Sequence, residues 1–209
     1  MPPALNPITR MPLPAATTAN RSFYSLDIGK VLHFAMIDTE SVLDVADVST
    51  ANQDWLKQDL GLAKLGSKWV LAGGHRPLYC TNGGYKSSNK DCSGMAETLR
   101  GQVEATLQGV DLVLGAHMHG YERTLPVKDS TVMANGTAPV YIVNGAGGNR
   151  EGNDDPKGDA PWSAPGAHSG VFGYGLMTFV SGPPGASTME YQFIESATGN
   201  TLDSVTLNK

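Results

Sequence analysis

Apolar runs along the chain predict buried strands that are separated by helices. Lys30 to Asp38 (KVLHFAMID) is an almost continuous apolar run ending on a carboxylate, which is typical of a strand covered on both faces. Ser67 to Gly73 (SKWVLAG) and Val110 to Gly115 (VDLVLG) repeat this pattern. The repetition favours a parallel or mixed sheet with helices on its faces, and hence an α/β fold.

Two segments between these runs have helical periodicity. A helix is predicted to begin at Thr50, which has capping-box spacing to Gln53, and Trp55, Leu56 and Leu60 form its apolar face. A second helix is predicted by apolar residues that recur every fourth position: Met95, Leu99, Val103 and Leu107.

The pattern changes after residue 138. A strand is predicted at Pro139 to Val143, followed by a glycine-rich loop of about 25 residues that runs to His168. Three further strands are predicted near the C-terminus, with a hairpin at Thr198-Gly199-Asn200 between the last two. They are Tyr174 to Val180, Met189 to Ile194 and Thr201 to Leu207.

Composition and charge narrow the class of protein. Residues 1–21 are proline-rich and without periodicity, so we expect an irregular lead-in, and residues 22–209 have no clear domain boundary. The hydrophobic share of 40% and charged share of 17% are typical of a globular protein. The net charge of −5 argues against a nucleic-acid partner, and no apolar run reaches the roughly 20 residues needed to cross a membrane.

Two features bear on the cellular compartment. Cys80 and Cys92 flank a polar segment, and such a pair is typical of a disulfide in an oxidising compartment, the alternative being two free thiols. Asn20-Arg-Ser and Asn135-Gly-Thr are N-glycosylation sequons. The proline-rich start is not a signal peptide, so a secreted protein would have its true N-terminus upstream of this sequence.

Three histidines directly follow predicted strands. His75 follows SKWVLAGG, and His117 and His119 follow VDLVLGA. Ligands bind at the carboxyl ends of strands in an open α/β sheet, so these side chains should meet in one crevice. In extended backbone, His117 and His119 would point to the same side, and the glycines before His75 would let backbone approach a metal or phosphate.

These imidazoles favour a metal site of one of two kinds. Three of them can complete a zinc site with an open position, or form part of a larger two-metal site. The competing interpretation is that the three histidines are unrelated. His33, inside an apolar run, is predicted to be a core residue, while His168 lies in the glycine-rich loop, where it would reach a substrate mouth.

The surrounding motifs resemble a known family. GHRPLYC (74–80) and AHMHGYER (116–123) resemble two signature segments of the purple acid phosphatases, within the calcineurin-like metallophosphoesterase superfamily. Further segments match in the same order along the chain: SFYSLDIGKVLHFAMIDTES (22–41), QDWLKQDL (53–60) and APVYIVNGAGGNREG (138–152). The resemblance implies the C-terminal half of the superfamily's β-sandwich flanked by helices, with residues 138–209 as the family's C-terminal region.

The resemblance also implies roles for individual residues. His75 and His117 would bind a divalent metal (zinc, manganese or ferrous iron) and His119 a ferric ion, in a dinuclear centre that hydrolyses small phosphate monoesters at acidic pH. Glu122 and Arg123 are expected to be structural. The full-length protein would be secreted, lysosomal or vacuolar.

The sequence also departs from the family pattern. Ala72 and Ala116 replace a valine and a glycine, as in the animal-type branch. The plant-type histidine pair near the substrate phosphate is replaced by GGYKSS, which leaves Asn82 or Tyr85 as candidate substrate contacts.

The family's three upstream motifs, which supply the other four metal ligands, are absent from these 209 residues. Asp38 is expected to end a strand and not to replace them. We therefore expect an N-terminally truncated acid phosphatase with an incomplete metal centre, whose exposed sheet edge favours aggregation. The alternative is a non-catalytic fragment that binds metal through three histidines.

Overall fold

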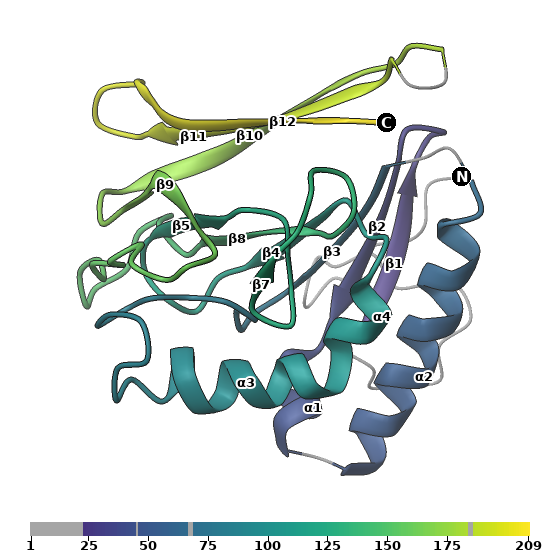
Figure 1. Cartoon of the computed structure of the whole chain (residues 1–209), viewed down its shortest axis with the longest axis horizontal. Coiled ribbons are helices and arrows are strands. Elements are labelled where there is room, and N and C mark those ends of the chain that lie inside the picture. Colours follow the sequence, from purple (N-terminus) through teal and green to yellow (C-terminus); the bar gives the residue numbers. More distant parts are fainter. Residues whose placement is uncertain (1–22, 45, 67–68, 184–185) are drawn as a thin grey trace.

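The chain is built from three layers. A computed structural model describes residues 23–44, 46–66, 69–183 and 186–209. A large sheet lies between a layer of helices on one face and a small three-stranded sheet on the other (Figure 1). The expected α/β class with a mixed sheet and flanking helices is confirmed.

The large sheet has seven strands and is mixed. Its central strands β2, β3, β4 and β8 run parallel, while β1, β5 and β9 pair antiparallel at its two sides. In spatial order the strands are β1 (Tyr24–Ile28), β2 (Leu32–Ile37), β3 (Trp69–Gly74), β4 (Leu112–Gly115), β8 (Val140–Asn144), β5 (Tyr121–Thr124) and β9 (Ser163–Ser169).

The small sheet is an antiparallel meander of β10 (Gly173–Val180), β11 (Thr188–Glu195) and β12 (Thr201–Asn208). Met189, Tyr191 and Phe193 alternate along β11 and point into a core that includes Leu71 and Ile142 of the large sheet. The predicted hairpin between the last two strands is confirmed. A separate two-stranded ribbon is formed by β6 (Val127–Lys128) and β7 (Thr131–Val132).

The opposite face of the large sheet is covered by helices. They are α1 (Thr39–Asp44), α2 (Ala46–Ala63) and a continuous helical run made of η1 (Asp91–Met95), α3 (Ala96–Leu99), η2 (Arg100–Glu104) and α4 (Ala105–Leu107), in which η1 and η2 are wider π-turns. The predicted apolar positions Leu56, Leu60, Leu99, Val103 and Leu107 are buried against the sheet. These contacts form the second core of the molecule.

Two predicted boundaries were wrong. The helix expected to begin at Thr50 begins at Ala46, so the capping-box pattern lies inside the helix, where Gln53 donates a hydrogen bond to Gln102. The loop expected to run to His168 contains β9, which pairs with β5. The sequence of β9, SAPGAHS, lacks the large apolar residues from which a strand is usually predicted.

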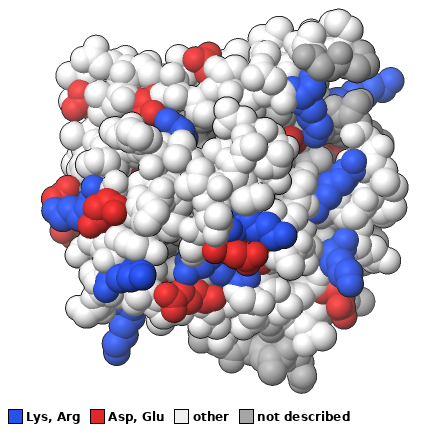
Figure 2. Space-filling model, in the orientation of Figure 1, with Lys and Arg blue, Asp and Glu red and all other residues white. Residues whose placement is uncertain are grey.

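The predicted lead-in at residues 1–21 and the sequon at Asn20 lie outside the described residues. None of the helices in the described ranges is long and apolar enough to cross a membrane. Acidic and basic side chains are interspersed on the face shown in Figure 2.

Candidate active site

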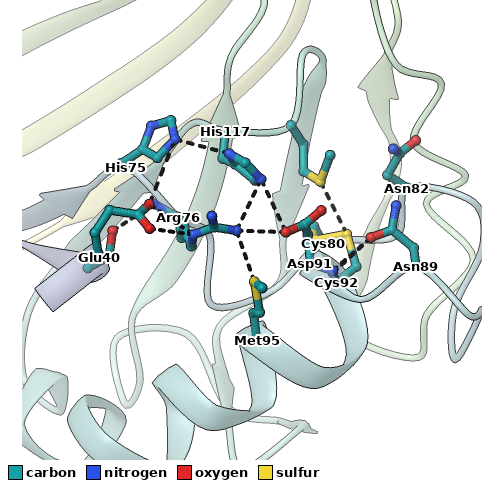
Figure 3. A network of polar contacts seen from close by, with 12 residues as sticks. Glu40, His75, Arg76, Cys80, Asn82, Asn89, Asp91, Cys92, Met95 and His117 are labelled. Atoms are coloured by element: carbon teal, nitrogen blue, oxygen red, sulfur yellow. Dashed lines mark hydrogen bonds and ion pairs between the residues drawn. A yellow bond between two sulfur atoms is a disulfide. The ribbon is translucent and has the colours of Figure 1, made fainter. Parts of the chain in front are cut away.

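The ends of two parallel strands bring His75 and His117 together. His75 directly follows β3, and His117 follows β4 by two residues. Because β3 and β4 are neighbours in the sheet, the two side chains meet at its carboxyl edge (Figure 3). His75 Nε2 lies 3.0 Å from His117 Nδ1, and the ring centroids are 4.9 Å apart.

The backbone that connects β4 to β5 turns sharply. The expected extended conformation around His117 was wrong, since this residue has a φ of 58°, in the left-handed region that non-glycine residues rarely adopt. The Met118 N–H donates to the Ala116 carbonyl, which closes the turn. His117 therefore faces His75, whereas His119 Nδ1 lies 3.8 Å from the Glu151 carboxylate.

The glycines before His75 serve the packing of the strand ends. A Cβ on Gly74 would lie 2.6 Å from the side chain of Thr39 and 3.0 Å from the Ile37 carbonyl oxygen. The close neighbours are therefore α1 and β2. The expectation that these glycines admit a metal or phosphate stays a prediction.

Arg76 connects the histidine pair to two acidic side chains. Its Nε donates to both carboxylate oxygens of Glu40, at 2.8 and 3.0 Å, and its Nη1 donates to Asp91 Oδ1 at 2.6 Å. The same Nη1 lies 3.2 Å from His117 Nε2 (Figure 3). Burial alone would lower the pKa of Arg76, but Glu40 and Asp91 raise it.

The electrostatic surroundings favour neutral imidazole at His75. Burial, together with the neighbouring His117, lowers the pKa of His75, although Glu40 opposes this shift. Its side chain nevertheless stays 56% exposed, so the ring remains accessible from solvent.

The segment from Cys80 to Cys92 forms one wall of the site. The two cysteines are joined by a disulfide, and Asn89 Oδ1 accepts hydrogen bonds from the backbone N–H groups of Asp91 and Cys92. These contacts fix the start of η1, from which Asp91 points toward His117 (Figure 3).

The two candidate substrate contacts have partners within the protein. Asn82 donates to Asp154 Oδ1 at 3.0 Å, and Asp154 Oδ2 accepts the backbone N–H of His119 at 2.7 Å. The Tyr85 ring packs edge-on against Trp162, with centroids 6.1 Å apart. Asn82 thus lies near the turn that carries the histidines, while Tyr85 packs against the protein's own aromatic residues.

The other two histidines lie elsewhere. His33 is a buried residue of β2, as predicted, and its two ring nitrogens contact Asp27 and Asp59 at 3.0 and 2.9 Å. His168 lies on β9 opposite Glu122, with its ring beside Gly158.

Glu122 and Arg123 hold the fold together, as expected. Glu122 is buried and accepts hydrogen bonds from the backbone N–H and the hydroxyl of Thr81 at 2.8 and 2.7 Å. Arg123 donates two hydrogen bonds to Asp203 on β12.

The histidine pair fits one divalent cation in part. Two imidazole ligands of a tetrahedral zinc ion lie roughly 3.3 Å apart, because each Zn–N bond is about 2.0 Å long. The 3.0 Å between His75 Nε2 and His117 Nδ1 is close to this separation. Across the described ranges, however, no three His, Cys, Asp or Glu side chains are arranged to hold an ion.

Comparison with known proteins shows which proteins the chain resembles. Residues 138–204 match the family described as "Iron/zinc purple acid phosphatase-like protein C". Acid phosphatase A of Cryphonectria parasitica is 37% identical over 93% of this chain, and acid phosphatase type 7 of Danio rerio is 32% identical over 78%. The matches cover 40% and 41% of these relatives, so the chain spans less than half of their length.

The fold agrees with this class. The purple acid phosphatase PPD1 from yellow lupin superposes with a TM-score of 0.67 over 92% of this chain and 34% of the plant protein, at 21% identity. Residues 138–204 are thus similar to the C-terminal region of the purple acid phosphatase-like proteins, and the rest of the chain is similar in sequence to acid phosphatases. Assignment to the animal-type branch stays a prediction.

Several residues around the histidines were not predicted. Glu40, Arg76, Asp91 and Asp154 surround or support the histidine turn. The arginine in the GHRP motif was the one signal in the sequence for these residues. A half-buried charged residue beside a predicted ligand needs acidic partners. Its partners are 36 and 15 residues away in sequence, so the pattern could not identify them.

Proposed function

We propose that this chain carries part of the active site of a metal-dependent acid phosphatase that hydrolyses small phosphate monoesters. The observation that carries the proposal is the convergence of His75 Nε2 and His117 Nδ1 at 3.0 Å. These atoms lie at the ends of adjacent parallel strands, where α/β enzymes bind their ligands. The relatives named acid phosphatases support the reaction class.

In the proposal, His75 and His117 hold a divalent cation (zinc, manganese or ferrous iron), and His119 faces a second, ferric ion. Bound cations would offset the negative charge of a phosphoryl group and polarise its oxygens. The protein's own contribution is to hold the two imidazole rings in a fixed orientation at a solvent-accessible edge. Asp154 supports this arrangement because it fixes the backbone at His119.

Asn82 is the better of the two proposed substrate contacts, since its partner Asp154 also binds the histidine turn. Tyr85 would have to leave Trp162 to reach a substrate there. A secretory or vacuolar location is part of the proposal and agrees with the Cys80–Cys92 disulfide and with the exposed sequon at Asn135.

The test is hydrolysis of p-nitrophenyl phosphate near pH 5, with metal content measured on the same sample. The wild-type chain is compared with His75→Ala, His117→Ala and the control His168→Ala, which removes an exposed histidine from β9. We expect metal-dependent activity that falls to the level without metal in the first two variants and is retained in the control.

The alternative function is metal binding without catalysis. It is favoured by the arrangement of the described residues, in which two imidazoles and no third ligand lie together. Zinc binding that depends on His75 and His117, without hydrolysis, would support this alternative. A chain that neither binds metal nor hydrolyses the ester would overturn both proposals.

A further inference from the structure

A cavity of about 290 Å³ lies between the two sheets, at the end of β3 opposite to His75. Its apolar lining comes from both sheets, with Trp69 and Val140 of the large sheet and Val205 and Leu207 of the small one. Small-molecule sites have volumes of roughly 300–1,000 Å³, so this cavity is at their lower end and suits a single small ring.

The two charged side chains that line the cavity in the described part of the chain already have partners. Asp111 accepts a hydrogen bond from Lys209 Nζ at 2.9 Å, and Arg123 donates to Asp203 at 2.7 and 2.9 Å. A charged ligand would have to disrupt one of these ion pairs, and removing one partner of a buried pair is costly. The cavity therefore favours an uncharged ligand.

The edge of β12 offers backbone hydrogen-bonding groups to the cavity. In the described ranges β12 is the last strand of the small sheet, with β11 on one side. The backbones of Lys209 and Ser187 each donate to the other. Since bonded and non-bonded positions alternate along an antiparallel pair, Thr206 and Asn208 direct their N–H and C=O groups away from β11. Both residues line the cavity, so a ligand there meets a strand edge that can bond an amide.

The rim of the cavity carries a glycosylation sequon. Asn135 lines the cavity and is exposed, and it lies in a turn closed by the Thr137 N–H, which donates to the Ala134 carbonyl at 3.1 Å. Gly136 has a φ of 76°, the left-handed conformation that glycine supplies in such a turn. The Asn-Gly-Thr sequon is therefore presented on a surface turn, where N-linked sugars are found.

We propose that Asn135 is N-glycosylated and that its first N-acetylglucosamine fills this cavity. Asn135 Nδ2 bonds to C1 of the sugar, the C1–O bond to a lipid-linked diphosphate donor breaks, and one amide proton leaves with the diphosphate. The sugar is uncharged, and its acetamide offers an N–H and a C=O to the edge of β12 and a methyl group to Val205 and Leu207. The glycan thus covers a strand edge that otherwise favours association between chains.

This inference shares only the secretory location with the proposed function, and its test involves neither metal nor hydrolysis, so either can fail without the other. The 209-residue chain is produced behind a cleavable signal in a eukaryotic secretory host, with Asn20→Gln to remove the other sequon. Endoglycosidase H trims the glycan to one N-acetylglucosamine, and Asn135→Gln in the same background gives the matched sugar-free chain. Mass spectrometry measures occupancy of Asn135, and NMR hydrogen exchange compares the β12 amides in the two chains.

We expect Asn135 to be occupied, and exchange at Thr206 and Asn208 to be about 5–10-fold slower with the sugar than in Asn135→Gln, the change that one ordinary hydrogen bond gives. Val205 and Leu207 are the internal control, because their N–H groups bond to β11 and should keep their rates. A bare Asn135 in the secreted chain, or equal exchange with and without the sugar, would overturn the inference. Slow exchange in Asn135→Gln that appears only at high concentration would also overturn it, since a second chain would then occupy the cavity.

Discussion

At the residue scale, the buried carboxylate of Glu122 makes the stability of the fold depend on pH. Burial raises its pKa to about 7, although hydrogen bonds from Thr81 oppose the shift. Its usual value is 4.5, so between these two pH values the folded chain binds more protons than the unfolded chain. The stabilising effect of the protonated form is complete below about pH 4.5 and is lost as the pH rises to about 7.

We therefore predict that Glu122→Gln flattens the pH dependence of stability. The wild-type chain should lose roughly 3 kcal/mol of unfolding free energy between about pH 4.5 and 7 through this group, and the amide should not. Urea unfolding across this range measures the difference. Glu97→Gln, at an exposed position, should keep the wild-type slope, and an equal slope in Glu122→Gln would contradict the assignment.

A second prediction at this scale concerns Gly74, where the added methyl group of alanine would meet Thr39 and the Ile37 carbonyl. We expect Gly74→Ala to cost about 1–3 kcal/mol, since neither neighbour can move freely at the end of a buried sheet. Gly101→Ala is the matched control. It lies in the helical run, where the new methyl has nothing within 4 Å, and should stabilise the chain by about 0.5–1 kcal/mol. A similar effect of both changes would show that Gly74 is not tightly packed.

At the element scale, strands differed in how well they could be predicted. β2, β3, β4 and β8 are buried on both faces by apolar residues, and their sequences show this directly. β5 (YERT) is also buried, but Glu122 accepts hydrogen bonds from Thr81 and Arg123 pairs with Asp203, partners that are 41 and 80 residues away in sequence. No local pattern could reveal those partners.

The prediction at the element scale concerns the edge strand β10. Within the described residues, β10 lies at an edge of the small sheet, where it pairs with β11. The side chains of Tyr174, Leu176 and Val180 on this strand are exposed. A long apolar edge strand favours association between chains. We predict that wild type self-associates at high concentration and that Leu176→Lys weakens this, because a lysine opposes edge-to-edge pairing.

Sedimentation velocity over a range of concentrations measures this association. Leu62→Lys makes the same chemical change at an exposed position on α2 and should leave the association unchanged. Equal sedimentation of the wild type and both variants as monomers would refute the expected role of the edge.

At the scale of the whole molecule, part of the site could be predicted from the sequence because the ends of the strands could be predicted. The apolar runs ended at His75 and near His117, and parallel neighbours necessarily bring their ends together. The geometry between them depends on the left-handed turn at His117 and on Asp91, which the disulfide-linked segment carries into place. Such features arise from loop closure across the molecule, so sequence periodicity does not contain them.

The two sheets are joined by a buried polar cluster as well as by apolar packing. Arg123 of β5 makes a two-point ion pair with Asp203 of β12, and Tyr121 donates to the same carboxylate at 2.6 Å. Burial alone would raise the pKa of Asp203, but the hydrogen bonds from Arg123 and Tyr121 lower it. Arg123 and Asp203 side chains are each only 12% exposed, so solvent screens the pair weakly.

We predict that Asp203→Ala destabilises the chain by about 3–5 kcal/mol, because it leaves the Arg123 guanidinium buried without a counter-charge. The double variant Arg123→Met with Asp203→Leu should recover much of that loss, since it removes both charges while keeping apolar volume. Urea unfolding of Asp203→Ala measures that loss, and urea unfolding of Arg123→Met, of Asp203→Leu and of the double variant gives the coupling energy. If the single and double variants were equally unstable, packing between the sheets, and not the ion pair, would be what holds the small sheet on the large one.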